Sequence, residues 1–230
     1  ERAFAYEGDT VEAIPHVTNE IINRIKSVGK NNDVVLVELG GTVGEYQNGI
    51  FFEAARILKL KNPNDVIHIH VTYLPLIRSV GELKSKPAQT SVHILNSMGI
   101  QPDMIVARSE VPVDKKRADK IALFCNIEND GLFLSPDVDS IYKVPEILED
   151  QKIAQAIVSK LSLKVKKQTG LLKSWNNAIK NIGLPKKEIN IGVVAKYYKS
   201  GDYDLSDSYI SVVEAIKHAS LNLGINTNLK

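Results

Sequence analysis

The sequence is poor in the residues that mark disulfide scaffolds, metal clusters and membrane segments. Its 230 residues include one cysteine, Cys125, so no internal disulfide can form and cysteines alone cannot build a metal site. This usage fits a reducing compartment, and we expect a cytoplasmic protein. No apolar stretch approaches the roughly 20 residues that span a bilayer, and no signal peptide opens the chain. The first residue is Glu1, not methionine, so we expect a trimmed or partial chain.

An excess of charge of one sign is also missing. Lysine and arginine number 29 against 27 acidic residues, and a net charge of +2 is too small to favour nucleic acid or an acidic membrane as a partner. Short basic clusters such as 115–117 and 164–167 are typical of solvated faces. With 43% hydrophobic and 24% charged residues, the composition is that of a soluble globular protein, one large domain or one domain plus part of another.

Short β-branched runs alternate with helical patterns along the chain. The runs that predict buried strands are 34–38, 66–74, 104–108, 121–125 and 189–197. The patterns that predict helices are 17–28, 49–60, 89–99, 144–163, 171–183 and 206–220. This alternation predicts an α/β fold with a mostly parallel sheet and helices on both faces.

The character of the chain changes after about residue 143. We predict a first domain over 1–163, a lysine-rich inter-domain linker with one helix over 164–188, and the opening β–α unit of a second α/β domain over 189–230. About 40 residues bury too little surface to stand alone, so the second domain is expected to be incomplete.

The stretch ELGGTVGEYQNG (38–49) looks at first like a phosphate-binding loop. It lacks the lysine and the Ser/Thr that such a loop places after its glycines, and glycines at 40, 41 and 44 do not match the dinucleotide-binding pattern. What remains is Glu38 at the end of an expected strand. It either holds Mg²⁺ beside a nucleotide or caps the following turn.

The second segment with possible chemistry is GELKSKPAQTS (81–91). Two lysines beside the start of a helix can cradle a triphosphate, although a Lys-x-Lys-Pro loop can also be a solvated turn. Cys125 is expected to be a packed core thiol, and His68 and His70, on one face of a strand, to be satisfied or exposed side chains rather than metal ligands.

Taken together, these segments resemble the CTP synthase family. The motifs that carry the resemblance, in order and in register, are TVEAIPHVTNEI (10–21), VVLVELGGTVGE (34–45), GELKSKPAQTSV (81–92), DMIVARSE (103–110), KIALFCNI (120–127), DVDSIYKVP (137–145) and IGVVAKYYKSGDYDLSDSYISVVEAIKHA (191–219).

The resemblance implies a fold and an activity. The first domain would be an amidoligase domain resembling phosphate-loop NTPases and dethiobiotin synthetase, and the second the start of a flavodoxin-like class I glutaminase domain. The family is a ligase of pyrimidine biosynthesis. It uses Mg²⁺ and ATP to phosphorylate UTP on the 4-oxygen, and ammonia from glutamine then displaces the phosphate. GTP activates, CTP inhibits, and the enzyme is a homotetramer.

Site residues follow from the resemblance by position. The implied metal ligand is Glu38, and Glu53 matches an acid associated with CTP inhibition. The implied UTP/CTP site comprises Glu45, Tyr46, Gln47, Lys84, Ser85, Lys86, Pro87, Ala88, Gln89 and Lys120. The implied ATP-bordering residues are Arg108, Pro136, Asp137 and Val138. No catalytic residue is assigned within this chain.

Several departures from the family pattern shape these expectations. Glu-Tyr-Gln (45–47) replaces the usual Asp-Ile-Glu, which puts CTP feedback in doubt, and the loop over 196–209 is longer than usual. The ATP phosphate loop and the glutaminase Cys-His-Glu set are absent from this sequence, so we expect the chain alone to be inactive. The alternative is a non-catalytic UTP/CTP-binding or assembly module. A ligase of the dethiobiotin synthetase type is a third reading, and the 81–92 and 34–45 motifs argue against it.

Overall fold

The computed structural model describes residues 10–164, 171–180, 182, 187–196, 199–200, 203–204 and 206–230. The helices are α1 (Thr18–Gly29), α2 (Gly49–Lys61), α3 (Lys86–Ser97), α4 (Lys115–Phe124), α5 (Val144–Asp150), α6 (Ile153–Lys160), α7 (Leu171–Ile179) and α8 (Ile210–Leu223), with short 3-10 or π turns at Ala13–Val17, Tyr46–Asn48, Asn129–Gly131, Ile141–Lys143 and Ser206–Tyr209. The strands are β1 (Ile69–Leu74), β2 (Leu76–Ile77), β3 (Glu82–Leu83), β4 (Met104–Ser109), β5 (Leu132–Pro136), β6 (Glu188–Ile191), β7 (Lys199–Ser200), β8 (Tyr203–Asp204) and β9 (Asn226–Leu229). In the part of the chain that the structure describes, no helix is both long and apolar enough to cross a membrane.

A parallel three-stranded sheet in the order β1-β4-β5 organises the first unit. β1 and β4 confirm the strands predicted over 66–74 and 104–108, whereas β5 was not predicted. The register pairs Leu74 with Ser109 and Ser109 with Pro136, so the three strands end together at one carboxyl edge. Loops that follow parallel strands converge at such an edge.

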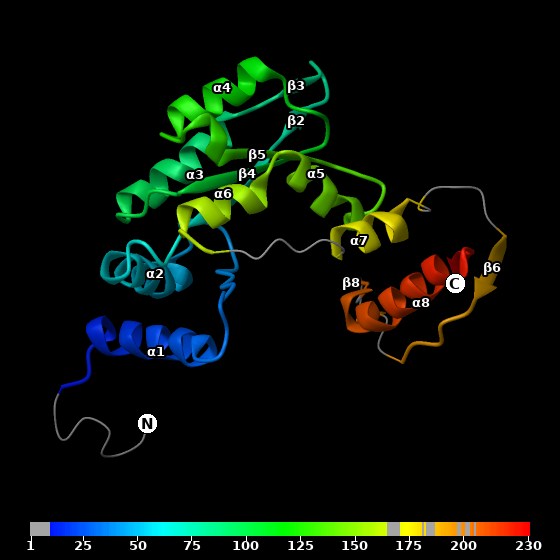
Figure 1. Ribbon diagram of the computed structural model, residues 1–230, viewed down its shortest axis with the longest axis horizontal. Coiled ribbons are helices and arrows are strands. Elements are labelled where there is room, and N and C mark those ends of the chain that lie inside the picture. The colour runs from blue at the N-terminus through cyan, green and yellow to red at the C-terminus, as the bar shows by residue number, and fades with distance from the viewer. Residues whose placement is uncertain are drawn as a thin grey trace. The chain divides into compact units, whose positions relative to one another are not determined.

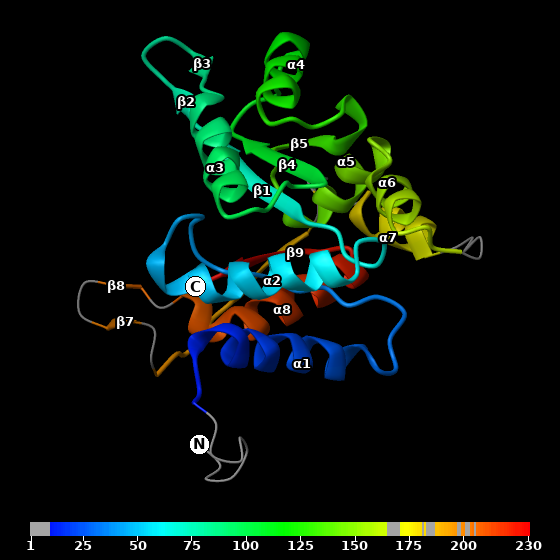
Figure 2. The same cartoon turned by 90° about the vertical axis from the view of Figure 1, so that its left-hand side faces the viewer.

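Helices cover both faces of this sheet, as Figures 1 and 2 show. On one face, Ile105 and Ala107 of β4 pack with Ala88 and Val92 of α3 and with residues of α4. On the other face, alternate β4 residues and Phe133 pack against α5 and α6. Successive side chains of a strand point to opposite faces, so β4 contributes to both cores. The predicted α/β class with helices on both faces of a parallel sheet is confirmed.

Two predicted strands are wrong. Residues 121–124 form the second half of α4, and Cys125 is its C-cap. Asp114 is the N-cap of this helix, and its carboxylate accepts the N–H of Arg117. The burial of residues 121–125 follows a helical period, because Ile121 and Cys125 are buried while Leu123 is 76% exposed. Residues 34–38 form no strand, and Leu36 is 93% exposed. An apolar run becomes a strand only where a neighbour accepts its backbone hydrogen bonds, and this run has none in the described structure.

The predicted helices are largely confirmed, with shifted ends. α3 begins at Lys86, three residues earlier than expected, and the helical stretch 144–163 is two helices separated at Gln151–Lys152. Lys152 adopts a left-handed conformation with φ of 64°, which interrupts the helical path. Residues 165–170 of the predicted linker lie outside the described residues, as does part of the loop over 196–209.

Residue contacts divide the chain into two units, 1–137 with 147–165, and 138–146 with 166–230. In the second unit, β6 pairs in parallel with β9. Among the described residues of the strand predicted over 189–197, only 189–191 are in a strand, as part of β6. Tyr142 packs edge-on to Trp175 at a ring-centroid distance of 5.9 Å, and its hydroxyl donates to Glu214 and lies 2.7 Å from His218 Nε2. Partial burial, together with the Glu214 carboxylate, raises the pKa of Tyr142 to about 12.

Candidate functional site

The Lys84–Gln89 motif occupies the loop that leads into α3, at the carboxyl edge of the sheet. After β1 ends at Leu74, the short β2–β3 hairpin carries the chain out and back, and α3 then begins with Pro87 in its first turn. The N–H of Lys84 donates to the carbonyl of Pro75 at 2.9 Å, which ties the loop to the end of β1. The start of α3 therefore lies at the edge where parallel sheets bind ligands.

Side chains of the motif divide into a buried scaffold and exposed cations. Ser85, Ala88 and Gln89 are buried, and the Gln89 side-chain amide donates to Ser85 Oγ at 3.0 Å. Lys86 and Pro87 are exposed, and Lys84 is partly exposed. The scaffold residues fix the backbone, which leaves the two lysines as the groups that can meet an anion.

A chain of ion pairs holds Lys84 in place. Lys84 Nζ lies 2.7 Å from Glu82, Glu82 lies 3.3 Å from Arg117, and Arg117 also pairs with Asp114. Arg117 Nε donates to the carbonyl of Leu83 at 3.0 Å. The hydrogen bond from Lys84, followed by the contact with Arg117, lowers the pKa of Glu82. A polyanion that binds Lys84 must therefore share it with Glu82 or displace Glu82.

Sequence reasoning missed Arg117, because the cluster 115–117 was interpreted as a solvated face. Only the fold brings Arg117 beside the 82–84 backbone, since 34 residues separate Arg117 from Leu83. The one available sequence signal was Asp114 three residues earlier, the usual spacing of a helix N-cap and its partner.

Arg108 and Asp137 lie side by side where β4 and β5 end. Arg108 Nη2 is 3.6 Å from Asp137 Oδ1, and the N–H of Asp137 donates to the carbonyl of Ser109 at 2.8 Å. Pro136 ends β5, and Val138 follows directly. These predicted ATP-bordering residues share the carboxyl edge with the Lys84–Gln89 loop, so the fold brings the two motifs to the same edge.

Lys120 lies on α4 and not directly before a strand, which corrects the predicted context. It is exposed, and its ammonium group lies 6.0 Å from the centroid of the Phe124 ring. α4 also carries Arg117, which contacts the β3 end of the loop. Lys120 therefore lies about one helical turn after Arg117, the residue of α4 that contacts the loop.

The glycine-rich loop over 38–49 is shaped by a compact hydrogen-bond network. Asn48 donates to the carbonyl of Gly40 at 2.8 Å and to Glu45 Oε2 at 3.3 Å. Gly41 has φ of +84°, and a Cβ there would stand 2.3 Å from Asn48 Nδ2 and 2.6 Å from Glu45 Oε2. The positive φ thus favours glycine, and a side chain at this position would displace the ends of the Asn48 and Glu45 side chains. Glu38 is exposed and does not lie at a strand end, so its predicted position is wrong.

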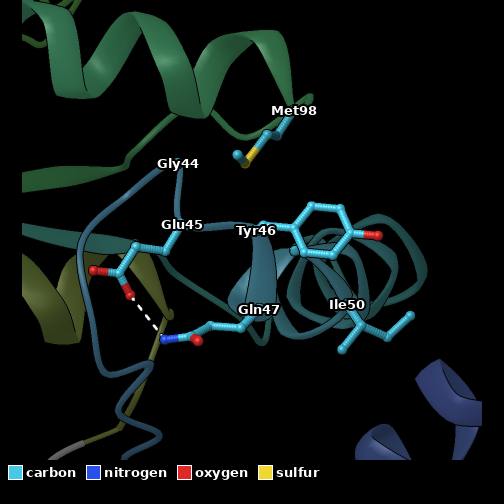
Figure 3. Close-up of a pocket in the computed structure, with 7 residues that line it drawn as sticks. Gly44, Glu45, Tyr46, Gln47, Ile50 and Met98 are labelled. Carbon is cyan, nitrogen blue, oxygen red and sulfur yellow. Dashed lines mark hydrogen bonds between the residues drawn. The ribbon is translucent and has the colours of Figure 1, made fainter.

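Residues 44–47, Gly49 and Ile50 line an open pocket of about 570 Å³, with Met98, the residue after α3, on one side (Figure 3). Three of the predicted UTP/CTP-binding residues, Glu45, Tyr46 and Gln47, line this pocket. Gln47 donates to Glu45 at 3.3 Å, whereas Tyr46 points away from this pair and is fully exposed. Ile50 also lines the pocket, so the lining combines polar and apolar side chains.

Glu53 lies on α2 and is paired within its own helix. Its two carboxylate oxygens accept from Arg56 Nη2 at 2.7 Å and Nε at 2.8 Å. This hydrogen bonding lowers the pKa of Glu53. The arrangement leaves Glu53 partly exposed as a fixed negative charge.

Helix α3 separates the two halves of the predicted UTP site. The Lys84–Gln89 loop leads into the first turn of α3. The Glu45–Gln47 pocket is lined by Met98, which directly follows the last residue of α3. With 12 residues, α3 spans about 18 Å at 1.5 Å per residue. The structure therefore does not bring the two halves together within one chain.

His68, His70 and Cys125 are packed within the first unit rather than grouped at a catalytic or metal site. His70 is buried and its Nε2 lies 2.8 Å from Ser91 Oγ, while His68 Nε2 is buried without a hydrogen-bond partner. Burial lowers the pKa of both imidazoles and raises the pKa of the Cys125 thiol to about 11. Cys125 packs in the α3–α4 core, as expected of an unreactive thiol.

The residues as placed do not form a Mg²⁺ site. Within the described ranges, no group of three or more His, Cys, Asp or Glu side chains could hold a metal ion. Glu38 is a single exposed carboxylate, whereas Mg²⁺ requires an octahedron of oxygen ligands that substrate phosphates usually complete. The metal-binding role of Glu38 stays a prediction from the resemblance.

Comparison with known proteins gives a consistent result over the whole chain. Residues 1–163 match the family model described as CTP synthase N-terminus. The chain is 43% identical over 230 residues to a protein named CTP synthase from Methanococcus maripaludis, and 43% identical over 229 residues to one from Pyrobaculum aerophilum. A CTP synthase from Buchnera aphidicola is 43% identical over 233 residues. All of this chain is covered in each case, but it spans only about two fifths of each relative, 42%, 42% and 40%.

Proposed function

Because the chain belongs to the CTP synthase family, we propose that it supplies much of the nucleotide-binding part of a glutamine-dependent ligase that converts UTP into CTP. The observation that carries this proposal is the Lys84–Gln89 loop. A buried side-chain hydrogen bond from Gln89 to Ser85 and a backbone hydrogen bond from Lys84 to Pro75 hold the loop, and its lysines stand beside the N-terminus of α3. Paired cations at a helix N-terminus are suited to a triphosphate.

The chemistry explains why two nucleotides are needed. The 4-oxygen of uracil is a poor leaving group, so the γ-phosphoryl group of ATP is first transferred to it, which yields ADP. Ammonia then attacks C4, inorganic phosphate departs with the oxygen, and loss of a proton leaves the 4-amino group of CTP. Enzymes assist phosphoryl transfer mainly by positioning and by offsetting charge.

In this proposal the loop holds the triphosphate of UTP. Lys84 and Lys86 contact phosphate oxygens, Lys120 adds a third cation, and the first N–H groups of α3 complete the cradle. Ser85, Pro87, Ala88 and Gln89 shape the loop rather than carry charge. Binding would draw Lys84 from Glu82, which remains paired with Arg117.

ATP would lie near Arg108, Pro136, Asp137 and Val138, at the same edge of the sheet. Arg108 can turn from Asp137 toward a phosphate, since their separation of 3.6 Å in an exposed setting indicates a weak pair. Mg²⁺ would enter bound to the phosphates of ATP, and Glu38 is its proposed protein ligand.

The distance along α3 bears on the predicted homotetramer. α3 is a continuous helix, so the loops at its two ends cannot approach each other without breaking it. We propose that the Glu45–Gln47 loop of one copy and the Lys84–Gln89 loop of another contact the same pyrimidine nucleotide. Mixing Gly41→Ala chains with Lys84→Ala chains should then restore part of the UTP binding that each lacks alone. If mixing restores nothing, each chain forms its own site.

The remaining proposals concern regulation and setting. CTP would compete with UTP for the same loops, with Glu53 nearby as a fixed negative charge, and Gln47 in place of an acid would weaken a contact to a ribose hydroxyl or an amino group. Glutamine supplies ammonia and GTP activates in the complete protein, which we place in the cytoplasm.

Calorimetric titration of this chain with UTP and then CTP tests the site. Removing one charge-assisted contact costs about 1.5–3 kcal/mol, so Lys84→Ala and Lys120→Ala should each weaken UTP binding about tenfold or more. Lys160→Ala is the matched control, because Lys160 is an exposed lysine on α6, remote from the loop in sequence. Equal UTP affinity in all three variants would contradict the proposal.

A non-catalytic UTP/CTP-binding or assembly module is the second candidate, favoured by the retained loop and pocket. Assays of CTP formation from UTP, ATP and ammonia separate the two. We expect UTP binding but no CTP formation by this chain alone, and CTP formation by the complete protein. A complete protein that binds UTP without forming CTP would favour the module.

A further inference from the structure

A buried histidine connects β1 to the helix that carries the lysine loop. His70 is 9% exposed, and its Nε2 lies 2.8 Å from Ser91 Oγ on α3. On the same face of β1, Leu74 is an apolar core residue with 1% exposure. A polar side chain is costly to bury in such a setting unless it gains a hydrogen bond, and Ser91 supplies one.

The two residues that form this hydrogen bond lie close in sequence to the two ends of the loop. His70 is four residues before the end of β1, and Ser91 is two residues after Gln89, the last residue of the motif. The loop between them is therefore held on one side by β1 and on the other by α3. Any shift of α3 along β1 would move the N–H groups and lysines at its start.

Apolar contacts alone do not prevent such a shift. Ala88 and Val92 pack α3 onto the sheet, but hydrophobic packing is non-directional and tolerates small displacements. A hydrogen bond requires a donor–acceptor distance near 2.8 Å and a defined angle. The His70–Ser91 bond therefore sets the position of α3 along β1 more closely than the surrounding packing does.

We propose that His70, acting through Ser91, is a positioning residue for triphosphate recognition, fixing where the start of α3 presents its N–H groups and lysines. This rests on the proposed function of the Lys84–Gln89 loop. The β- and γ-phosphates reach this loop, so the pair governs affinity for a nucleoside triphosphate and not for the monophosphate of the same base. Burial keeps the imidazole neutral at neutral pH, which suits a bond to an uncharged hydroxyl.

Two measurements on His70→Leu and Ser91→Ala test the proposal, namely amide hydrogen exchange without nucleotide and titration with UTP and UMP. We expect faster exchange over 84–90 and about tenfold weaker UTP binding, with UMP binding unchanged and the two substitutions together no worse than one. His70→Gln, whose amide can reach Ser91, should restore both. Ser97→Ala is the control, because the Ser97 hydroxyl donates to the carbonyl of Ile94 within α3 itself.

The outcomes distinguish this proposal from the proposed function. If the unaltered chain binds no UTP, the proposed function fails, and faster exchange over 84–90 would still support the positional role of the pair. If exchange over 84–90 and UTP affinity match the Ser97→Ala control in both variants, the inference is wrong. A loss of UTP and UMP affinity together would also overturn it, because that indicates general damage. Should His70→Leu fail to fold, the milder Ser91→Ala decides.

Discussion

The adjacent glycines Gly40 and Gly41 offer a sharp test of how the 38–49 loop is built. At Gly41, φ is +84°, and a Cβ would meet Asn48 Nδ2 at 2.3 Å and Glu45 Oε2 at 2.6 Å. At Gly40, the same Cβ would meet nothing within 4 Å, and no left-handed conformation is required. Alanine at the two positions therefore differs in strain and in space while adding the same methyl group.

The expected cost follows from these contacts. A non-glycine residue in the left-handed region costs about 1–2 kcal/mol, and displacing Asn48 from Gly40 removes a hydrogen bond worth about 1 kcal/mol. Gly41→Ala should thus lower the free energy of unfolding by about 2–3 kcal/mol, unless the loop relaxes by abandoning its network. Gly40→Ala should change it by less than about 0.5 kcal/mol.

Urea unfolding followed by circular dichroism measures the stability difference, and UTP titration measures the effect on the loop. If Gly41→Ala keeps its stability because the loop relaxes, UTP affinity should still fall, since Glu45 and Gln47 lose their arrangement. Equal stability and equal affinity of the two variants would refute the reasoning.

Three further predictions concern polar contacts elsewhere. Tyr142→Phe removes the hydroxyl between α8 and the 141–143 turn, and we expect a loss of about 1 kcal/mol and altered fluorescence of Trp175, the only tryptophan. The hydrogen bond from Lys84 and the contact with Arg117 lower the pKa of Glu82 below its unfolded value of 4.5. The ion pairs of Glu82 therefore stabilise the folded protein fully above pH 4.5, and this stabilisation is lost as the pH falls through the lower folded pKa. Hydrogen exchange over the loop should accelerate only in that lower pH range. Asp103 accepts from the N–H of His68 at 2.6 Å and from Lys59 at 3.1 Å, so Asp103→Ala should cost about 2–3 kcal/mol in urea unfolding. Asp103→Asn should cost less, because its amide oxygen can still accept; equal costs would contradict this and assign the whole effect to the charge.

The sequence by itself determined the class of fold and the identity of the motifs. Amphipathic periods located α1, α2, α3 and α8 because one face of a helix records its burial directly in the residue pattern. β4 was predicted because a continuous apolar run marks a strand that is covered on both faces. β1 was predicted because its run is rich in β-branched and aromatic residues, although only one of its faces is buried. The Lys84–Gln89 motif was recognisable because its residues are contiguous.

Short apolar runs were the least informative signals. Residues 121–125 are compatible with a strand or with one face of a helix, and the capping of α4 by Asp114 decided for the helix. Residues 34–38 have strand-forming side chains, but a strand needs a hydrogen-bonding neighbour, and no local pattern supplies one. β5 was missed because five residues ending in proline give too short a pattern.

Only the tertiary structure decided how the site residues are grouped. The family resemblance placed the 45–47 and 84–89 motifs in one predicted nucleotide site, yet they lie at opposite ends of α3, because a rigid helix separates the loop that precedes it from the residues that pack at its far end. The partners that hold the lysine loop, Arg117 and the His70–Ser91 pair, depend on contacts between residues 21 to 34 positions apart. Such contacts leave no periodic trace in a sequence, since they arise only when separate elements pack against each other.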